Sequence, residues 1–206
     1  NVTIPHKKII LKYLESIENS AKSITAVNCV SNQKGYNTDW IGFTKTLDQN
    51  NIDLKNKSCM VLGSGGAAYA ISYALVKLQV KSIKIENRSI KNRISLENWI
   101  DNRMNLKLAS DPEVFINCTP LGMSPDIHRI PSNYNIKEGN IVIDTIYNPM
   151  KTKWLKQCEK KGAIIITGLD MLIAQGIASL NIWLNDDIFD KVNLKHIKNI
   201  LENELC

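Results

Sequence analysis

The stretch SCMVLGSGGAA (residues 58–68) passes from a short apolar run through a glycine turn into an alanine-rich segment. It contains the pattern GxGxxA between a predicted strand, Ser58–Leu62, and a predicted helix, Ala67–Leu78, whose apolar residues recur every three or four positions. In such a turn the first glycine permits the tight bend, the second admits a pyrophosphate, and the alanine allows close helix–strand packing. The pyrophosphate then binds the N–H groups at the helix start. In this context a purely structural turn is the weaker interpretation, and we predict dinucleotide contacts at Gly63, Ser64, Gly65, Gly66 and Ala67.

Strands and helices alternate on the C-terminal side of this turn. Alternating or continuous apolar runs predict strands, and helical potential lies between them. The predicted strands are Ser82–Glu86, Val114–Asn117, Ile141–Asp144 and Ala163–Ile166, and the helices lie around 96–100 and 152–160. This alternation predicts an α/β fold with a Rossmann-type, doubly wound parallel sheet.

The turn ENRS, residues 86–89, bears on which dinucleotide binds. An acidic residue about 20 positions after the glycine pattern usually takes the ribose hydroxyls of NAD, whereas an arginine accommodates the 2′-phosphate of NADP. The chain offers both, as Glu86 and Arg88. A guanidinium pairs with phosphate and stacks on adenine, and Asn87 and Ser89 add short polar groups. We therefore favour NADP, with NAD as the alternative and a solvated helix start as the structural interpretation.

Two flanking regions lie outside this alternation. The N-terminal flank shows an amphipathic helix pattern around Lys8–Ser20 and a hairpin pattern around Ala26–Tyr36. The C-terminal flank contains a strongly apolar helix, Leu169–Leu184, and a polar tail with a last helix. We predict that residues 1–38 and 168–206 together form a partial α/β substrate-binding lobe beside a dinucleotide-binding domain of residues 39–167. A cleft between two such lobes is a common place for a small-molecule site.

Composition excludes several classes of protein. The formal charge is +6, but lysines are spread along the chain and aromatic residues make up only 6%, so we expect no nucleic-acid partner. No apolar run reaches the ~20 residues that span a bilayer, so no membrane partner is expected either. The five cysteines form no CxxC pair and no zinc-like spacing with histidine, which predicts reduced core thiols, no metal and a cytoplasmic location.

Several motifs resemble the shikimate dehydrogenase family, and they occur in the order and spacing of that family. They are NVTIPHK (1–7), AVN (26–28), YNTDWIGF (36–43), the glycine turn, ENRS (86–89), INCTPLGM (116–123), DTIYNP (144–149) and GLDMLIAQ (168–175). The resemblance covers nearly the whole chain. It implies an NADP-dependent oxidoreductase that interconverts 3-dehydroshikimate and shikimate in the pathway to aromatic amino acids.

The resemblance also assigns a catalytic pair and a set of binding residues. Lys7 and Asp39 would form the pair, a role that residue type alone would not give Lys7, since Lys8 beside it looks equally ordinary. A lysine near a carboxylate suits the proton transfer that accompanies hydride transfer. The substrate would contact Thr3, Asn28, Asn37, Tyr147 and Gln175, and the cofactor would also contact Thr119, Leu121 and Gly168. The structural alternatives are a helix cap for Asn37, a hydrogen bond between lobes for Gln175 and a simple turn for residues 119–123.

Two departures from the family qualify these expectations. NADP-dependent members often carry a second basic residue where this chain has Asn92. Members also have a segment before NVTxPHK, with a Ser-x-Ser pair that holds the substrate carboxylate, so we interpret the chain as a fragment without that segment. The alternatives to shikimate dehydrogenase are a quinate/shikimate enzyme using NAD and a non-catalytic dinucleotide-binding fragment. A monomer or a homodimer is expected.

Overall fold

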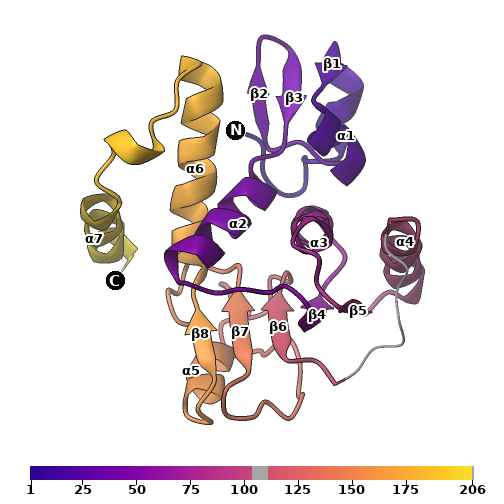
Figure 1. The fold of residues 1–206 in the computed structure, drawn as a ribbon, viewed down its shortest axis with the longest axis vertical. Coiled ribbons are helices and arrows are strands. Elements are labelled where there is room, and N and C mark those ends of the chain that lie inside the picture. The colour runs from indigo at the N-terminus through magenta and orange to yellow at the C-terminus, as the bar shows by residue number, and fades with distance from the viewer. Residues whose placement is uncertain (104–110, 206) are drawn as a thin grey trace.

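The structure is a computed structural model and describes residues 1–103 and 111–205. Helices and strands alternate over most of this length (Figure 1). In chain order the elements are η1 (Ile9–Tyr13), β1 (Ser16–Ile17), α1 (Asn19–Ile24), β2 (Cys29–Ser31), β3 (Lys34–Tyr36), α2 (Asp39–Gln49), β4 (Ser58–Leu62), α3 (Gly66–Lys77), β5 (Ser82–Glu86), α4 (Ile90–Asp101), β6 (Val114–Asn117), β7 (Ile141–Asp144), α5 (Lys153–Glu159), β8 (Ile164–Ile166), α6 (Gly168–Leu184), η2 (Phe189–Lys191) and α7 (Leu194–Leu205).

The larger sheet has the strand order β5-β4-β6-β7-β8 within the described residues, and every pairing is parallel. Helices α3 and α4 cover one face, and α5 covers the other (Figure 1). The predicted doubly wound sheet is therefore confirmed. The chain leaves β4 toward β5 on one side and later returns to β6 on the other. A sheet of this kind binds its ligand at such a switch point, outside the carboxyl ends of the strands.

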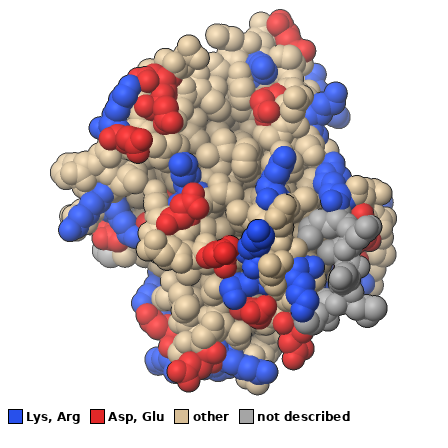
Figure 2. Space-filling model, viewed as in Figure 1, with Lys and Arg blue, Asp and Glu red and all other residues tan. Residues whose placement is uncertain are grey.

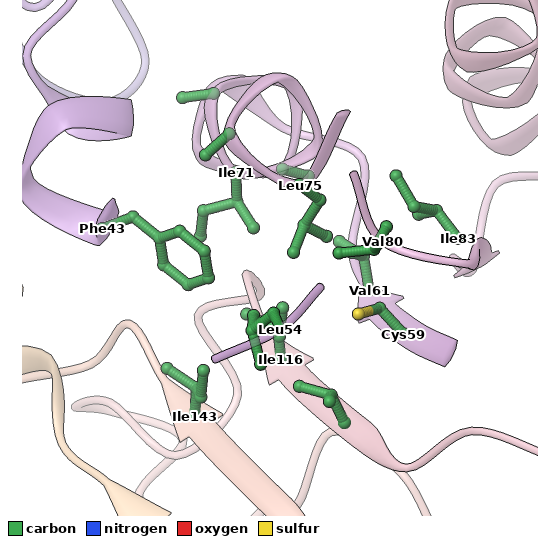
Figure 3. Packing of buried hydrophobic residues seen from close by; sticks show 14 of the residues in the cluster. Phe43, Leu54, Cys59, Val61, Ile71, Leu75, Val80, Ile83, Ile116 and Ile143 are labelled. Atoms are coloured by element: carbon green, nitrogen blue, oxygen red, sulfur yellow. The ribbon is translucent and has the colours of Figure 1, made fainter. Parts of the chain in front are cut away.

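The main core lies between this sheet and α3, with α2 contributing from one side. Ile71 and Leu75 of α3 point toward Val61 and Ile116 on the strands, and Phe43 of α2 closes the cluster (Figure 3). All five residues of β4 are buried, because helices cover both faces of a parallel sheet. Each such large apolar side chain contributes roughly 1.5–3 kcal/mol by burial. Burial of β4 on both faces thus fixes the position of its carboxyl end, from which the glycine turn begins.

A second, smaller sheet has the order β1-β3-β2, with β1 parallel and β2 antiparallel to β3. The predicted hairpin is confirmed, but the predicted helix over Lys8–Ser20 is wrong. Only the short 3₁₀ helix η1 forms, and Ser16 then pairs with Lys34 of β3. The carboxylate of Glu18 accepts the N–H groups of Ser20 and Ala21 and starts α1 there. Strand pairing and this cap override the helical periodicity.

The long apolar helix α6 lies between α2 on one side and α7 on the other (Figure 1). Its buried residues Leu169, Ile173 and Ile177 pack against η2 and α7 through Phe189, Ile197 and other apolar side chains. Trp183, near the end of α6, donates its indole N–H to the Val30 carbonyl of β2 at 2.9 Å. Residues from both ends of the chain therefore pack together.

The surface seen in Figure 2 carries lysine and arginine interspersed with aspartate and glutamate. The positive charge on this face is scattered and forms no stripe. Among the described helices, none has both the length and the apolar character to cross a membrane.

Candidate functional site

The glycine turn after β4 has the geometry that its sequence predicts. Gly63 has φ +110°, a conformation that L side chains rarely adopt, and a Cβ there would lie 3.0 Å from the Cys118 carbonyl oxygen. Gly65 precedes the first residue of α3, and a Cβ built on it would meet nothing within 4 Å. No side chain caps this helix start. The open space and the uncapped helix end fit a phosphate group of a dinucleotide.

Lys7 and Asp39 lie directly beside this turn. The Lys7 ammonium nitrogen is 2.6 Å from Asp39 Oδ2, and the side chains are only 16% and 8% exposed. This is a short, charge-assisted hydrogen bond between residues 32 positions apart. A Cβ built on Gly66 would lie 3.6 Å from Lys7 Cδ. The predicted catalytic pair therefore packs against the predicted cofactor turn.

Asn28 joins this pair to α6. Its amide nitrogen donates to Asp39 Oδ1 at 2.9 Å and to Gln175 Oε1 at 3.2 Å, while its oxygen accepts the Thr38 N–H at 2.6 Å. One carboxylate oxygen of Asp39 thus accepts a hydrogen bond from Lys7, and the other accepts one from Asn28. The structure brings four of the predicted site residues into one hydrogen-bonded group: Lys7, Asn28, Asp39 and Gln175.

Asn37 and Thr38 hold the start of α2. Asn37 Oδ1 accepts the Asp39 N–H at 3.1 Å, and its amide donates to the Ala26 carbonyl at 3.0 Å. Thr38 is the residue before α2, but its side chain makes no cap hydrogen bond. Its hydroxyl instead pairs with Ser179 Oγ at 3.1 Å. Sequence reasoning missed Ser179, although it lies one helical turn after Gln175 and therefore on the same face of α6.

The loop after β6 carries the predicted cofactor residues Thr119 and Leu121, and the loop after β7 carries the predicted substrate residue Tyr147. Asn117 Oδ1 accepts the N–H and hydroxyl of Thr119 at 2.9 and 2.7 Å, and its amide donates to the Leu121 carbonyl at 3.3 Å. Gly168 packs against the second loop, since a Cβ on it would lie 2.5 Å from the Thr145 carbonyl oxygen. Tyr147, in that loop, is 40% exposed. Among the described residues no hydrogen bond joins Tyr147 or Thr3 to the Lys7–Asp39 pair.

At the end of β5, the ENRS turn is partly occupied by its own contacts. Asn87 donates to the Ser89 carbonyl at 3.0 Å, and Ser89 Oγ caps α4 by accepting the Asn92 N–H at 3.4 Å. Burial raises the pKa of Tyr134 to about 12, and the Glu86 carboxylate beside it adds to the shift. Arg88 is exposed and forms no salt bridge within residues 1–103 and 111–205. The turn therefore leaves a guanidinium available and holds its carboxylate against Tyr134.

The cysteines show no sign of a reactive or metal-binding role in the described part of the chain. Cys29, Cys59, Cys118 and Cys158 are free thiols, and Cys206 lies outside the described residues. Burial raises the pKa of all four thiols, that of Cys59 to about 12 and that of Cys158 to about 11. No cluster of three or more histidine, cysteine, aspartate or glutamate side chains suited to a metal occurs in the same residues.

A parallel sheet with a glycine turn at its switch point, and a lysine–carboxylate pair packed on that turn, define a Rossmann-type dinucleotide-dependent oxidoreductase. Residues 1–30 match the model of the shikimate dehydrogenase substrate binding domain. The chain is 37% identical over 208 residues to "Shikimate dehydrogenase (NADP(+))" of Caldicellulosiruptor bescii, covering 94% of this chain and 70% of that protein. The chain belongs to the shikimate dehydrogenase family.

Solved structures agree with this assignment. A shikimate dehydrogenase in complex with NADP⁺ superposes with a TM-score of 0.88 at 34% identity, covering 100% of this chain and 76% of that one. The enzyme of Thermus thermophilus, in complex with NADP(H) and shikimate, gives a TM-score of 0.80 at 28% identity, covering 90% and 72%.

Proposed function

We propose that this protein interconverts shikimate and 3-dehydroshikimate with NADP as the hydride carrier. The observation that carries the proposal is the Lys7–Asp39 pair at 2.6 Å, packed against Gly66 of the glycine turn. A proton-transferring group and a cofactor turn in contact are what the oxidation of a secondary alcohol requires. The relatives named above are called shikimate dehydrogenases, with NADP⁺ given as the cofactor or bound in the structure.

The two parts of the reaction divide between the protein and the cofactor. Bound NADP⁺ supplies a ring that accepts the hydride from the carbinol carbon. For oxidation, the Lys7 ammonium first gives its proton to solvent. The free amine then takes the hydroxyl proton as the hydride leaves, and the re-formed ammonium is again paired with the Asp39 carboxylate. Reduction returns the same proton to the carbonyl oxygen. Because the pair is largely buried, its electrostatic effect on the developing charge is stronger than it would be in water.

The residues around the pair suit a polyhydroxylated substrate. We assign substrate contacts to Thr3, Asn28, Asn37, Tyr147 and Gln175, in addition to Lys7 and Asp39. Asn28 and Gln175 border the pair through hydrogen bonds, which orient their amide groups. Gln175 also donates its amide N–H to the Leu172 carbonyl at 2.9 Å, which further orients the amide group.

The chain's residues also fit NADP in preference to NAD. Arg88 has no acidic partner among the described residues, so its guanidinium is available to a 2′-phosphate. Glu86, which would otherwise take ribose hydroxyls, lies beside the Tyr134 hydroxyl. Gly63 to Ala67, Asn87 to Ser89, Thr119, Leu121 and Gly168 complete the proposed cofactor contacts.

The test is NADP-dependent oxidation of shikimate by the purified protein, followed by nicotinamide absorbance. Lys7→Ala should lower kcat by about 10²- to 10⁴-fold, the usual contribution of a general acid–base residue. Lys8→Ala is the matched control, because Lys8 is the neighbouring lysine, stacks over the Tyr69 ring at 4.2 Å, and does not reach Asp39. It should retain kcat within about threefold, since an exposed cation–π contact is worth only ~1 kcal/mol.

The same assay with quinate in place of shikimate, and with NAD in place of NADP, tests the alternative of a quinate/shikimate enzyme that uses NAD. Faster turnover of quinate would reassign the substrate, and a preference for NAD would overturn the role of Arg88. Cofactor binding without turnover of either substrate would leave a dinucleotide-binding protein. Equal losses in the Lys7 and Lys8 variants would contradict the assigned roles.

A further inference from the structure

Asp144 is a buried carboxyl group that the proposed proton transfer does not use. It ends β7, pairs in register with Asn117 of β6, and is 0% exposed. It forms no salt bridge within the described residues. A buried carboxylate without a cation is costly unless hydrogen bonds satisfy its oxygens. The hydrogen bonds that satisfy the Asp144 oxygens therefore decide what this residue does at the carboxyl end of the sheet.

Three neutral donors from three different segments converge on Asp144. Its Oδ1 accepts the Asn117 amide and the Ile146 N–H, both at 3.0 Å, and its Oδ2 accepts the Thr152 hydroxyl at 2.8 Å. Burial raises the pKa of Asp144 to about 6, while these three hydrogen bonds lower it. The side chain thus links the ends of β6 and β7 to the residue that caps α5.

Two of these partners, Asn117 and Ile146, in turn make contacts within and beside the loops at the carboxyl ends of the strands. Asn117 binds Thr119 and Leu121 in the loop after β6. The Ile146 carbonyl accepts the Gly168 N–H at 3.2 Å at the start of α6. The proposed cofactor residues Thr119, Leu121 and Gly168 are therefore each two hydrogen-bonded contacts away from one carboxyl group. None of them lies at the adenosine end, which is formed by the turn after β5.

We propose that Asp144 is a positioning residue that sets the two loops after β6 and β7 against the nicotinamide half of the cofactor. This inference rests on the proposed function, because it assumes that a nicotinamide dinucleotide lies across this edge. It assigns the adenosine half to contacts that do not depend on Asp144. Loss of the carboxyl group should therefore affect the two halves of the cofactor unequally.

The experiment compares Asp144→Ser with Asp144→Asn by calorimetric titration with two probes, NADP⁺ and adenosine 2′,5′-bisphosphate, which lacks the nicotinamide half. Ser removes the acceptor for Asn117 and Ile146 and leaves space for a water. The Kd for NADP⁺ should rise about tenfold through lost preorganisation, and that for adenosine 2′,5′-bisphosphate should stay within about twofold. A misaligned ring should also lower kcat for shikimate by about 10²-fold.

Asp144→Asn is the conservative variant, because its Oδ1 still accepts from Asn117 and Ile146, and only the contact with Thr152 changes. It should restore both NADP⁺ affinity and kcat to within about threefold of the wild type. Val142→Ala is the matched control for general damage. It lies on the same strand and sheet face as Asp144, two residues earlier, and packs in the core below. It should lower thermal stability and leave both affinities unchanged.

Two results would overturn the inference. One is an Asp144→Ser protein that is folded by circular dichroism and binds NADP⁺ as tightly as the wild type. The other is an equal loss of affinity for both probes, which would assign Asp144 to the stability of the whole domain. If the wild type binds NADP⁺ but does not oxidise shikimate, the proposed function fails while the two-probe comparison still decides the role of Asp144.

Discussion

At the scale of single residues, burial changes what Asp144 contributes to folding. Its pKa rises from 3.8 to about 6, mainly because burial disfavours the charged form. Between these two values the folded protein keeps a proton that the unfolded chain has released. The free energy of unfolding contributed by this group is therefore highest below pH 3.8 and falls as the pH rises toward 6. Above pH 6 the loss is complete.

Replacing Asp144 by Asn should remove this pH dependence. Relative to the variant, the wild type should lose roughly 3 kcal/mol of unfolding free energy between pH 4 and pH 7, at about 1.4 kcal/mol per pKa unit. Urea unfolding of both proteins at several pH values in this range measures the difference. Parallel stability curves would show that Asp144 titrates alike in the folded and unfolded chains.

At the scale of elements, the contact between α2 and α6 sets the geometry of the site. Asp39 begins α2, and Gln175 lies on α6, so the spacing of the two helices decides whether Asn28 reaches both side chains. The helices are in close contact at Gly42, where a Cβ would lie 2.8 Å from Gln175 Cβ and 2.9 Å from the Met171 carbonyl oxygen. Only a residue without a side chain fits there.

Gly42→Ala should therefore destabilise the protein by about 1–3 kcal/mol through overpacking, even though alanine favours helices. It should also lower kcat, because Gln175 is displaced. Gly176→Ala is the matched control: a Cβ there meets nothing within 4 Å, so the change should be neutral or stabilising by up to about 1 kcal/mol. Chemical denaturation and shikimate kinetics measure both effects. A Gly42→Ala protein as stable as Gly176→Ala would show that α2 and α6 are less closely packed.

At the scale of the whole molecule, aromatic side chains join α1, which lies beside the smaller sheet, to α3 and α4, which cover the larger sheet. The Trp99 indole N–H donates to the Ser23 carbonyl at 2.9 Å, and its ring meets Tyr69 edge-on at 5.7 Å. Arg103 stacks over the same ring at 4.0 Å. One helical turn further along α3, Tyr73 meets Trp40 of α2 edge-on at 5.4 Å. These contacts hold α1 and α2 against α3 and α4, and α3 is the helix that follows the glycine turn.

Two substitutions of Trp99 separate the parts of this contact. Trp99→Phe keeps a ring against Tyr69 but loses the hydrogen bond to Ser23, and should cost about 1 kcal/mol. Trp99→Ala loses the packing as well and should cost about 3 kcal/mol or more. Denaturant unfolding measures both. Equal stabilities of the Phe and Ala variants would mean that ring packing contributes nothing to the junction.

The position of the cofactor turn was accessible from the sequence, because its signals are local. A strand, a glycine turn and an alanine-rich helix follow one another within 20 residues, and β4, β5, β6 and β7 have the predicted bounds. The family motifs also singled out Lys7, Asn28, Asp39 and Gln175, which the structure joins by hydrogen bonds. The helix predicted over Lys8–Ser20 does not form. Ser16 instead pairs with Lys34, and local periodicity cannot reveal a contact between positions so far apart in the chain.

The sequence by itself thus determined the order of strands and helices from β4 to α6, the place of the glycine turn and the membership of the family. Only the tertiary structure decided which buried polar groups meet: Thr38 with Ser179, Asn28 with both Asp39 and Gln175, and Asp144 with Asn117, Ile146 and Thr152. The physical reason is the separation along the chain over which each kind of interaction acts. Periodicity and turn chemistry act over a few residues, whereas a buried polar side chain depends on partners that only packing of distant segments brings within about 3 Å.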